Sequence, residues 1–573
     1  MKFYDTYLKP QTKSMVIGLI CKALGAILEL VLPFLTSNII DEVIPTGDVQ
    51  RIILNCLLMV LCAIGAWRLN IFANRNASLV ARNATEHIRH DLFEHILALS
   101  SHKTDEFTIP SLESRMTTDT YNVHRMISMV QRIGIRGPII MIGGLFFTFS
   151  MEPVLSLVIL ATFPFIGFLV YFRATKGLPL FKHIQKVSDQ MVTVVRENAQ
   201  GIRVIKSLSK KDYEKNRFEQ VNQKLETETI EANRKMAIVN PGINLFLNLG
   251  LFGVILLGAY RISIGVSSTG KIIAFMSYFT IMSRAMMMIG RIFIMTSQGL
   301  ASVQRIEEVL DTETEKDVHI GGYPNKDNKH AIEFDDVTFS YLGVKNNLQH
   351  ISFTLDQGQS LGIIGAIGSG KTTILSLLLR FYEINSGRIY LNGRDIRNLE
   401  FSDLRQQFGT VMQNDTLFRE SIKENIVFDR EITDEDITKA IHTAQAKEFI
   451  EQYEDGIEHM LTGKGSNLSG GQKQRVLLAR ALASHTPFLL LDDSSSALDY
   501  KTDALLRKAL EENHQDSTKI IIAERVSSIM NCNKIIVLDK GKIDAIGTHD
   551  ELLENSSIYA SIYASQMGGA LYD

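Results

Sequence analysis

Long apolar segments alternate with polar ones over about the first 300 residues of the chain. Six of them hold enough apolar residues to cross the roughly 30 Å hydrocarbon core of a bilayer, which takes about 20 helical residues. They lie near residues 14–40, 52–75, 128–150, 153–173, 236–262 and 271–297. The pattern predicts an α-helical transmembrane domain of six helices.

The connections between these segments differ in length and charge. Residues 42–50, 151–152 and 263–270 are short and lack Lys and Arg, whereas residues 76–127 and 174–235 are long. The long connections carry basic residues, among them Arg82, Arg89, Lys103 and Arg115 in the first and Lys176, Lys182, Lys210, Lys211 and Lys215 in the second. Cytoplasmic segments are enriched in Lys and Arg, so we expect both long connections and both chain termini on the cytoplasmic side of the plasma membrane.

Both long connections have the composition of helices rather than of flexible linkers. Helix-favouring runs cover residues 83–99 and 212–233. A helix of about 25 residues would reach about 37 Å beyond the membrane. Each connection is therefore expected to bring a turn deep into the cytoplasm, where a soluble domain could push on it.

From about residue 331 the chain has the composition of a charged soluble domain, with short apolar runs alternating with helical ones as in α/β proteins. Residues 312–330, just before it, are polar and contain Gly321, Gly322 and Pro324. These residue types interrupt regular structure. We therefore expect a transmembrane domain with cytoplasmic extensions (1–311), a linker (312–330) and a soluble α/β domain (331–573).

A glycine-rich segment of the soluble half follows an apolar strand and precedes a helical run. Its residues include Gly365, Gly368, Ser369, Gly370, Lys371, Thr372 and Thr373. In such a loop the glycines let successive backbone N–H groups turn toward phosphates, the lysine reaches the β- and γ-phosphates, and a threonine hydroxyl binds Mg²⁺. The segment predicts a nucleotide-binding P-loop.

A second apolar strand, residues 487–491, ends in Asp492 and Asp493. Carboxylates at such a strand end hold Mg²⁺, directly or through water, and orient the water that attacks a phosphate. Together with the glycine-rich loop, this strand end indicates an α/β P-loop NTPase domain. Its expected ligands are ATP and Mg²⁺.

Between these two motifs lies Leu468-Ser469-Gly470-Gly471-Gln472, which resembles the signature of ABC proteins. Tyr341 is placed where that family stacks an aromatic ring on adenine, Gln413 is placed at the Q-loop, where the family contacts Mg²⁺, and residues 496–499 match the D-loop. In the membrane half, residues 115–119 and 197–207 resemble the intracellular loops of bacterial multidrug-type exporters. By this resemblance the chain is identified as an ABC exporter half-transporter, a six-helix membrane domain fused to an ATP-binding domain.

The resemblance implies how the ATP sites form. Each site is closed by the P-loop and Walker B residues of one domain and by the signature of the other, so Ser469, Gly470, Gly471 and Gln472 would complete a partner's site. The resemblance also implies short coupling helices, expected near residues 114–123 and 205–214, that dock on ATP-binding domains. Nucleotide binding would then close the two domains and open the membrane helices outward.

Three positions depart from the family pattern. Asp493 stands where active members have a Glu that polarises the attacking water, and Glu524 stands where they have a His that contacts the γ-phosphate. Gly463 replaces a Glu in the loop before the signature. These departures favour the degenerate-site subunit of a heterodimer, and the alternative is sequence drift in a working homodimer.

The cargo is expected to be drugs or other amphipathic compounds. Glu29 lies in the first span, and Arg284 and Arg291 lie seven residues apart in the sixth. Intramembrane charges normally face a cavity or a partner. Glu29 would either attract cationic compounds or hydrogen-bond to a neighbouring helix, and the arginines would anchor acidic groups or lipid headgroups. The alternatives are a homodimeric exporter of lipid or peptide and a regulatory ATP-binding subunit.

Composition narrows the list of partners. The formal net charge of −3 at pH 7 gives no argument for nucleic acid. The four cysteines are scattered, which indicates neither a disulfide framework nor a zinc site. Residues 1–12 are polar and contain Pro10, which argues against a signal peptide and favours a short helix on the membrane surface. The expected partners are a second half-transporter, membrane lipid and an amphipathic small molecule.

Overall fold

The computed structural model describes residues 3–315 and 320–567, apart from the side chains of a few helical residues between positions 170 and 294. Contacts between Cα atoms divide the chain into two compact units. One unit comprises Met1–Leu97 and Phe107–Thr312, and the other comprises Ala98–Glu106 and Glu313–Asp573. The short segment Ala98–Glu106 therefore belongs with the C-terminal half of the chain.

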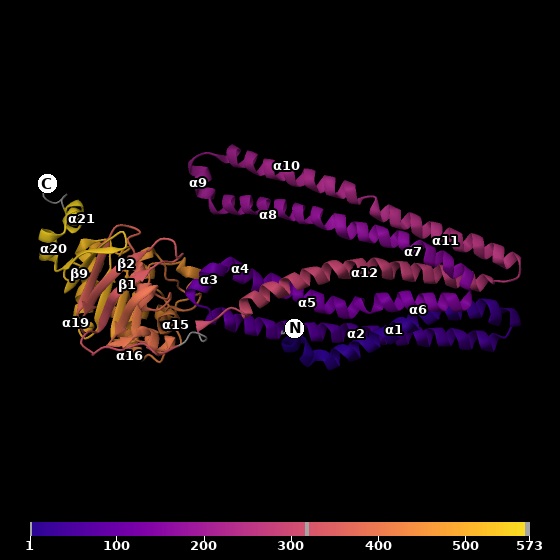
Figure 1. Cartoon of the computed structure of the whole chain (residues 1–573), viewed down its shortest axis with the longest axis horizontal. Helices are drawn as coiled ribbons and strands as arrows, with labels where there is room; N and C mark the ends of the chain where they lie inside the picture. The colour runs from indigo at the N-terminus through magenta and orange to yellow at the C-terminus, as the bar shows by residue number, and fades with distance from the viewer. Residues whose placement is uncertain (1–2, 316–319, 568–573) are drawn as a thin grey trace. The chain divides into compact units, whose positions relative to one another are not determined.

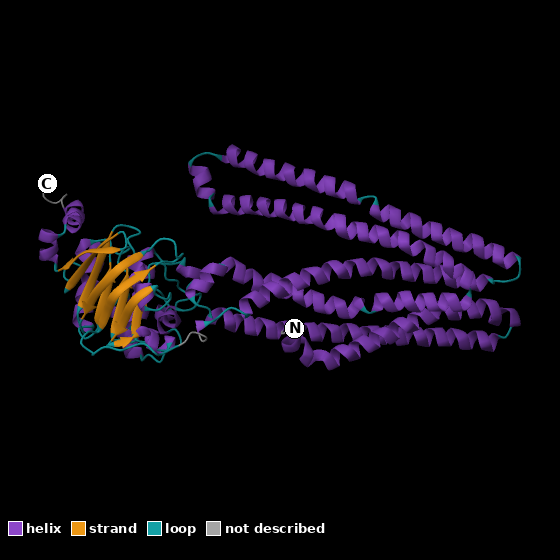
Figure 2. Ribbon diagram, viewed as in Figure 1, coloured by secondary structure: helices purple, strands orange, loops and turns teal. Residues whose placement is uncertain are grey.

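The first unit is helical (Figures 1 and 2). Its helices are α1 (Thr12–Asn38), α2 (Val49–Ala98), α4 (Ile109–Ser114), α5 (Thr120–Met129), α6 (Arg136–Met151), α7 (Pro153–Phe172), α8 (Leu178–Gln200), α9 (Ile202–Ser207), α10 (Lys211–Met236), α11 (Val239–Ser263) and α12 (Thr269–Leu310). All residues of the helix α3 (Ser101–Phe107) except Phe107 belong to the second unit. Short π-helical turns at Arg115–Asp119 and Val130–Gly134 join α4, α5 and α6.

Each of the six predicted spans lies in a helical stretch. Within the described residues, five helices are long and apolar enough to cross a membrane, and Pro153–Leu169 is a shorter apolar helix. The helices α2 and α12 continue well past their predicted spans, to Ala98 and Leu310. The predicted helical first half with long extensions is confirmed.

The apolar core of this unit lies where α12 meets α1, α6 and α7. Phe275, Tyr278, Phe279 and Met282 of α12 are buried there. The Tyr278 hydroxyl donates a hydrogen bond to the carbonyl oxygen of Leu30 on α1, at 2.6 Å. Inside an apolar core a phenol needs such a partner, because an unpaired hydroxyl away from water is costly.

The helices α8 and α10 pack against each other and are joined by α9 (Figure 1). The short helices at the turns of the two long connections are α3 and α9, that is Ser101–Phe107 and Ile202–Ser207. The expected coupling helix near 114–123 is wrong, because those residues lie inside a continuous helical run from Ile109 onward. The chain turns earlier, at Thr108, whose φ is 65°. The next helix begins at Ile109, with Pro110 in its first turn.

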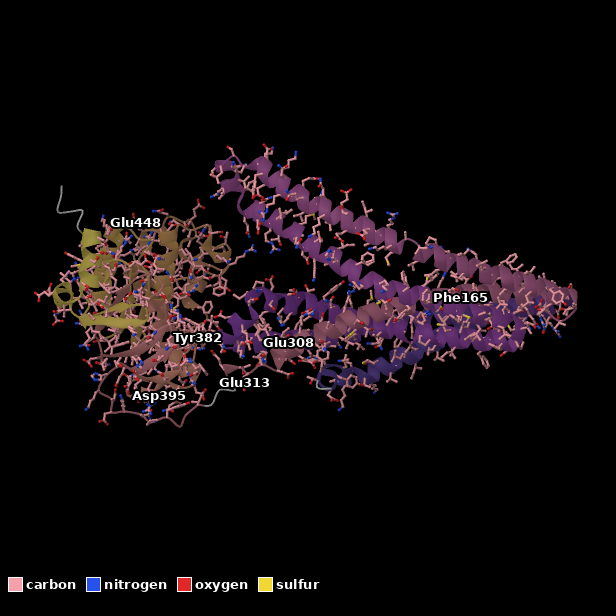
Figure 3. The ribbon with its side chains drawn as sticks, turned by 45° about the horizontal axis from the view of Figure 1, so that its top comes forward. Phe165, Glu308, Glu313, Tyr382, Asp395 and Glu448 are labelled. Carbon is pink, nitrogen blue, oxygen red and sulfur yellow. The ribbon has the colours of Figure 1, made fainter. Side chains whose placement is uncertain are left out.

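The segment 115–119 faces α12 instead. Asp119 is buried and accepts hydrogen bonds from Ser302 Oγ at 2.8 Å and Arg305 Nε at 2.9 Å. Arg115 is also buried and pairs with Glu308, labelled in Figure 3, with 3.0 Å between Nη2 and Oε2. These bonds fasten the first long connection to the part of α12 that continues past its predicted span.

The N-terminal residues pack on protein. Phe3 and Tyr7 are buried, and the Tyr7 hydroxyl donates to Asp91 Oδ2 of α2 at 2.9 Å. The turn Tyr4–Leu8 is therefore held against α2 by this hydrogen bond.

The second unit contains two sheets (Figure 2). Their strands are β1 (Ile332–Phe339), β2 (Leu348–Leu355), β3 (Ser360–Gly365), β4 (Ser386–Leu391), β5 (Arg394–Asp395), β6 (Phe408–Val411), β7 (Phe488–Asp492), β8 (Thr518–Ile522), β9 (Lys534–Asp539) and β10 (Lys542–Gly547). The smaller sheet has the order β2-β1-β4-β5, and the larger has the order β10-β9-β3-β8-β7-β6. β3 runs parallel to both β8 and β9, and β8 runs parallel to β7, as expected for an α/β domain.

The helices of this unit are α13 (Lys371–Leu378), α14 (Phe401–Arg405), α15 (Ile422–Val427), α16 (Asp434–Thr443), α17 (Lys447–Ile450), α18 (Gly470–Leu482), α19 (Tyr500–Asn513), α20 (His549–Asn555) and α21 (Ser557–Met567). Three apolar clusters lie among the described residues of the unit. One joins the smaller sheet to β3 and α13, another joins α15, α16 and α18 to β7, and a third joins β9 to α20 and α21. The predicted α/β fold of the second half is confirmed.

Candidate functional site

The strand order of the larger sheet brings the candidate nucleotide motifs together. β3, β8 and β7 are neighbours and parallel, so their carboxyl ends meet at one edge of the sheet. The glycine-rich loop follows β3, Asp492 ends β7 with Asp493 directly after it, and Glu524 follows β8. Ligands of open α/β sheets bind at this kind of edge.

The glycine-rich loop adopts a path that side chains would block. A Cβ on Gly365 would lie 2.1 Å from the carbonyl oxygen of Leu538. Gly370 has a φ of 101°, and a Cβ there would lie 2.7 Å from Leu348 Cδ2. Both positions therefore require glycine, and the loop turns directly into α13, whose N-terminus favours anions.

A cavity of about 240 Å³ lies over this loop. It collects most of the predicted residues, and its lining consists of Asn347, Ile367, Gly368, Gly370, Lys371, Thr372, Thr373, Gln413, Asp492, Asp493, Ile522 and Glu524. Gly365 lines the next cavity along the loop, and Ser369 is buried with an Oγ atom that has no hydrogen-bond partner. These predicted residues come from four separate segments of the sequence, and the fold brings the four segments to one cavity.

Lys371 is the cation of this cavity. Its Nζ donates hydrogen bonds to the carbonyl oxygens of Gly365 and Ala366, at 2.8 and 3.0 Å. Burial lowers the pKa of the Lys371 ammonium, and the negative charges of Glu524, Asp492 and Asp493 oppose that effect. The cavity therefore surrounds one cation with three carboxyl groups.

Asp492 is almost fully enclosed, at 2% exposure. Burial raises the pKa of its carboxyl group, while a hydrogen bond with Thr372 lowers it. Its Oδ2 atom is buried without a hydrogen-bond partner. An unsatisfied carboxylate oxygen beside a threonine hydroxyl suits a hard cation, because Mg²⁺ prefers oxygen ligands and keeps several waters. The donor set of Asp492, Thr372 and Gln413 therefore fits Mg²⁺.

Asp493 turns sharply out of the strand, with a φ of 50°. Its N–H donates to the carbonyl oxygen of Ile522 at 2.9 Å, which ties the turn to β8. Burial raises the pKa of its carboxyl group, a hydrogen bond with Ser496 lowers it, and the charge of Glu524 raises it again. Glu524 is itself exposed, and both acidic groups line the cavity.

Tyr341 lies beside a second cavity, of about 380 Å³. Its hydroxyl donates to Thr373 Oγ1 at 3.2 Å, and its ring meets the ring of Tyr382 edge-on at 4.9 Å between centroids. Tyr382, labelled in Figure 3, also donates a hydrogen bond to Asp105 and meets the ring of His102 edge-on. Tyr382 was not among the predicted residues. The only signal in the sequence was its position in Arg380-Phe381-Tyr382, shortly after the helix that follows the glycine-rich loop.

The signature residues form the N-terminus of α18. Ser469 Oγ accepts a hydrogen bond from the N–H of Gln472 at 3.3 Å, and Gln472 Oε1 accepts one from the N–H of Ser469 at 2.8 Å. This capping box stabilises the first turn. A Cβ on Gly471 would lie 3.0 Å from the carbonyl oxygen of Ala497. The signature residues line none of the three cavities above.

Gln474 on α18 is a contact that sequence reasoning missed. Its Nε2 donates to the carbonyl oxygen of Asp493 at 3.2 Å and to Ser496 Oγ at 3.0 Å. Its Oε1 accepts from the N–H of Ala497 at 2.9 Å. One amide thus connects the helix of the signature to the loop that carries Asp493.

Comparison with known proteins identifies the family that combines such a helical unit with these nucleotide motifs. Residues 15–286 match the family model described as ABC transporter transmembrane region, and residues 348–496 match the one described as ABC transporter. The uncharacterized ABC transporter ATP-binding protein YfiB of Bacillus subtilis (strain 168) is 33% identical over 565 residues, which cover 98% of each chain. The chain belongs to the ABC transporter family.

Two further ABC transporters are similar over nearly the whole chain. The ATP-dependent lipid A-core flippase of Vibrio cholerae serotype O1 is 31% identical over 571 residues, covering 98% of this chain and 97% of that one. A solved structure of a bacterial Atm1-family ABC exporter with ATP bound has a TM-score of 0.80 at 24% identity, covering 97% and 98% of the two chains. The present ABC transporter is therefore a multi-pass half-transporter whose membrane region is fused to an ATPase domain, and it couples ATP to export.

The structure describes the side chains of two of the three candidate cargo residues of this ABC transporter. Glu29 on α1 pairs with Arg136 on α6, with 2.7 Å between Oε2 and Nη2, and its Oε1 accepts from Asn70 on α2 at 3.2 Å. Arg284 is exposed on α12, and the side chain of Arg291 lies outside the described residues. Two roles were expected for Glu29, attraction of cationic compounds or a hydrogen bond to a neighbouring helix. The structure contains bonds from Glu29 to two neighbouring helices.

The buried carboxylate of Asp492 predicts a measurable effect on stability. Because its pKa is raised in the folded chain, the charged form penalises the folded state at pH 7, and that penalty disappears as pH falls through the raised value. Asp492→Asn should remove about 1–3 kcal/mol of this penalty and so stabilise the folded protein. For a domain of this size, each kcal/mol raises the melting temperature by about 2–4 °C. Thermal unfolding of the nucleotide-free protein in detergent measures the effect.

Asp499→Asn is the matched control for Asp492→Asn. Asp499 is an exposed N-cap whose pKa is lowered by the hydrogen bonds from Thr502, so its charge stabilises the fold and its substitution should not raise the melting temperature. Added Mg²⁺ and ATP should stabilise the wild type more than Asp492→Asn. A lower melting temperature for nucleotide-free Asp492→Asn would contradict the assignment.

Proposed function

We propose that this half-transporter is the degenerate-site subunit of a heterodimer that exports drugs or other amphipathic compounds across the cytoplasmic membrane. The observation that carries the proposal is the placement of Asp493 and Glu524 in one cavity with Lys371. Two acidic side chains occupy the positions from which active relatives polarise water and contact the γ-phosphate.

Each of these substitutions weakens hydrolysis for its own reason. Asp493 is one methylene shorter than Glu, and a displacement of about 1 Å in a catalytic group can cost about 100-fold in rate. Its raised pKa also shows that burial disfavours its charge. The Glu524 carboxylate repels a γ-phosphate, where a histidine would stabilise the developing charge. The site would bind Mg²⁺ and ATP and hydrolyse the nucleotide slowly.

The P-loop and the signature, which both match the family pattern, support a role for this chain as one subunit of a heterodimer. The P-loop, with Thr372, Gln413 and Asp492 as the groups for Mg²⁺, retains the chemistry for binding nucleotide. The signature Ser469 to Gln472 keeps a capped helix N-terminus and exposes its first two residues. In this proposal the signature completes the competent site, whose Glu and His come from the partner half-transporter.

The transport cycle follows from this division of work. Binding of two nucleotides closes the two ATP-binding domains, and the cytoplasmic helices transmit that closure to the membrane bundle. Hydrolysis at the partner's site resets the cycle. The basic long connections support a topology in which both termini and the ATP-binding domain are cytoplasmic.

Asp493→Asn tests the degenerate site in the assembled pair. The ATPase rate of the pair in lipid should change by less than about twofold, whereas loss of the partner's catalytic Glu should lower it about 10²–10⁴-fold. The lone chain, assayed beside the pair, should show little turnover. A large loss with Asp493→Asn would contradict the proposal, and brisk drug-stimulated turnover of a lone homodimer would favour the homodimeric alternative.

Ser469→Ala tests whether the signature serves the partner's site. The variant should abolish most turnover of the pair while leaving nucleotide affinity at this chain's own P-loop unchanged. Because it also removes a helix cap, worth about 0.5–2 kcal/mol, Thr548→Ala is the control, since Thr548 forms the same capping box on α20. Equal loss of ATPase activity in Ser469→Ala and Thr548→Ala would mean that Ser469 only stabilises its helix, and it would contradict a role in the partner's site.

A second candidate cargo, a lipid or another compound with an acidic headgroup, is supported by the charges inside the membrane helices. Lys22, Arg132 and Arg136 lie close enough to Glu29 and to one another to interact electrostatically, and Glu29 pairs with Arg136, so three cations accompany one anion. Lys22 is buried at 3% exposure and donates to Asn74 at 3.0 Å. The lipid A-core flippase named above is similar over the same helices. An excess of positive charge within membrane helices favours an anion as its counter-charge.

Arg132→Gln separates the two cargo classes. If the cargo is acidic, stimulation of the pair's ATPase activity by anionic lipid vesicles should fall several-fold in this variant, while stimulation by cationic amphipathic drugs should not. Arg68→Gln is the control, because Arg68 is an exposed arginine on the membrane-spanning part of α2. Drug stimulation that falls together with lipid stimulation would contradict the acidic cargo, and no movement of either compound class would favour the regulatory subunit.

A further inference from the structure

The C-terminal helix α21 contacts the segment that carries Glu524. Gln566, near the end of this helix, donates from Nε2 to the carbonyl oxygen of Glu524 at 2.8 Å. Its Oε1 accepts a hydrogen bond from the N–H of Val526, also at 2.8 Å. A single amide thus binds the backbone on both sides of Arg525, and the residue directly before Arg525 carries the Glu524 carboxylate.

The first half of α21 is firmly anchored. Tyr559 is fully buried, and its hydroxyl lies 2.7 Å from His549 Nδ1. It packs in an apolar cluster with Ile364 of β3 and Val526. The position of Gln566 at the other end of the helix is therefore set by a buried contact more than one turn away.

Between α21 and the glycine-rich loop lies a cavity of about 480 Å³. Ile558 and Ile562 of α21 line one side, and Gly365 and Ile367 line the other. Glu524 lines this cavity and also the nucleotide cavity, so its side chain lies between the two. There is accordingly space on the α21 side into which the carboxylate can move.

The other flank of the segment is bound to a different loop. Arg525 donates to the carbonyl oxygens of Leu498 and Ser496, at 3.2 and 3.4 Å, and its Cζ lies 4.8 Å from the centre of the Tyr500 ring. Glu524 is therefore held between α21, through Gln566, and the loop after β7, through Arg525. Loss of either contact frees one side of the segment.

We propose that Gln566 is a positioning residue that holds the Glu524 carboxylate at the edge of the nucleotide cavity and thereby sets the preference of this site between nucleoside triphosphate and diphosphate. The inference rests on the nucleotide site proposed above. With Gln566 in place, the carboxylate repels the γ-phosphate, which a diphosphate lacks. Without it, the carboxylate moves toward the α21 cavity and the repulsion falls.

The experiment measures binding of adenylyl imidodiphosphate and of ADP, each with Mg²⁺, to the full-length chain in detergent by titration calorimetry. Gln566→Met keeps the size of the side chain and removes both hydrogen bonds. It should raise the affinity ratio of triphosphate analogue to ADP by about threefold to tenfold, as expected for a weakened charge repulsion near the surface. Ser565→Ala is the control, because Ser565 Oγ bonds only Ile562 of its own helix, and it should leave the ratio unchanged.

A double substitution decides whether Gln566 acts through Glu524. Glu524→Gln alone should raise the same ratio, and adding Gln566→Met to it should change the ratio by less than about 1.5-fold, since the two act on one charge. Equal loss of both affinities in Gln566→Met, or the same shift with and without Glu524, would overturn the inference while leaving the nucleotide site intact. Failure of the wild type to bind either nucleotide would overturn the nucleotide site as well.

Discussion

The parallel order β3-β8-β7 is the constraint on which the rest of the soluble half depends. Each of these strands ends at the same edge of the sheet, and each delivers one part of the nucleotide cavity. The glycine-rich loop, the Asp492–Asp493 pair and Glu524 are far apart in sequence, and they become neighbours only through this pairing. The acidic character of the cavity follows directly, because β7 ends in Asp492, Glu524 follows the end of β8, and both line the same cavity as Lys371.

The sequence was sufficient for the fold class and for most of the nucleotide cavity. Apolar length predicts spans, and a glycine-rich loop between a strand and a helix has one common use, so both patterns carry their structure in local sequence. The predicted position of the first coupling helix was wrong because the turn depends on the backbone angle φ of Thr108. A threonine in a sequence does not indicate a positive φ.

Gln474, Gln566 and Tyr382 escaped prediction for a related reason. Each acts through hydrogen bonds to groups that are distant in sequence, and two of the three bind backbone atoms, which leave no trace in residue identity. An amide side chain on a helix surface is ordinary by composition. Only the fold shows which amides connect the nucleotide loops to one another.

The segment Ala98–Glu106 has a consequence for what counts as the ATPase part of this chain. It lies within the first long connection, yet it belongs to the compact unit that contains the nucleotide cavity, and Asp105 receives a hydrogen bond from Tyr382, whose ring meets that of Tyr341. A polypeptide cut at residues 312–330 would lack one wall of the cavity beside Tyr341 and would leave the Tyr382 phenol without this partner. The catalytic half is thus built from two discontinuous pieces, and the membrane half supplies one of them.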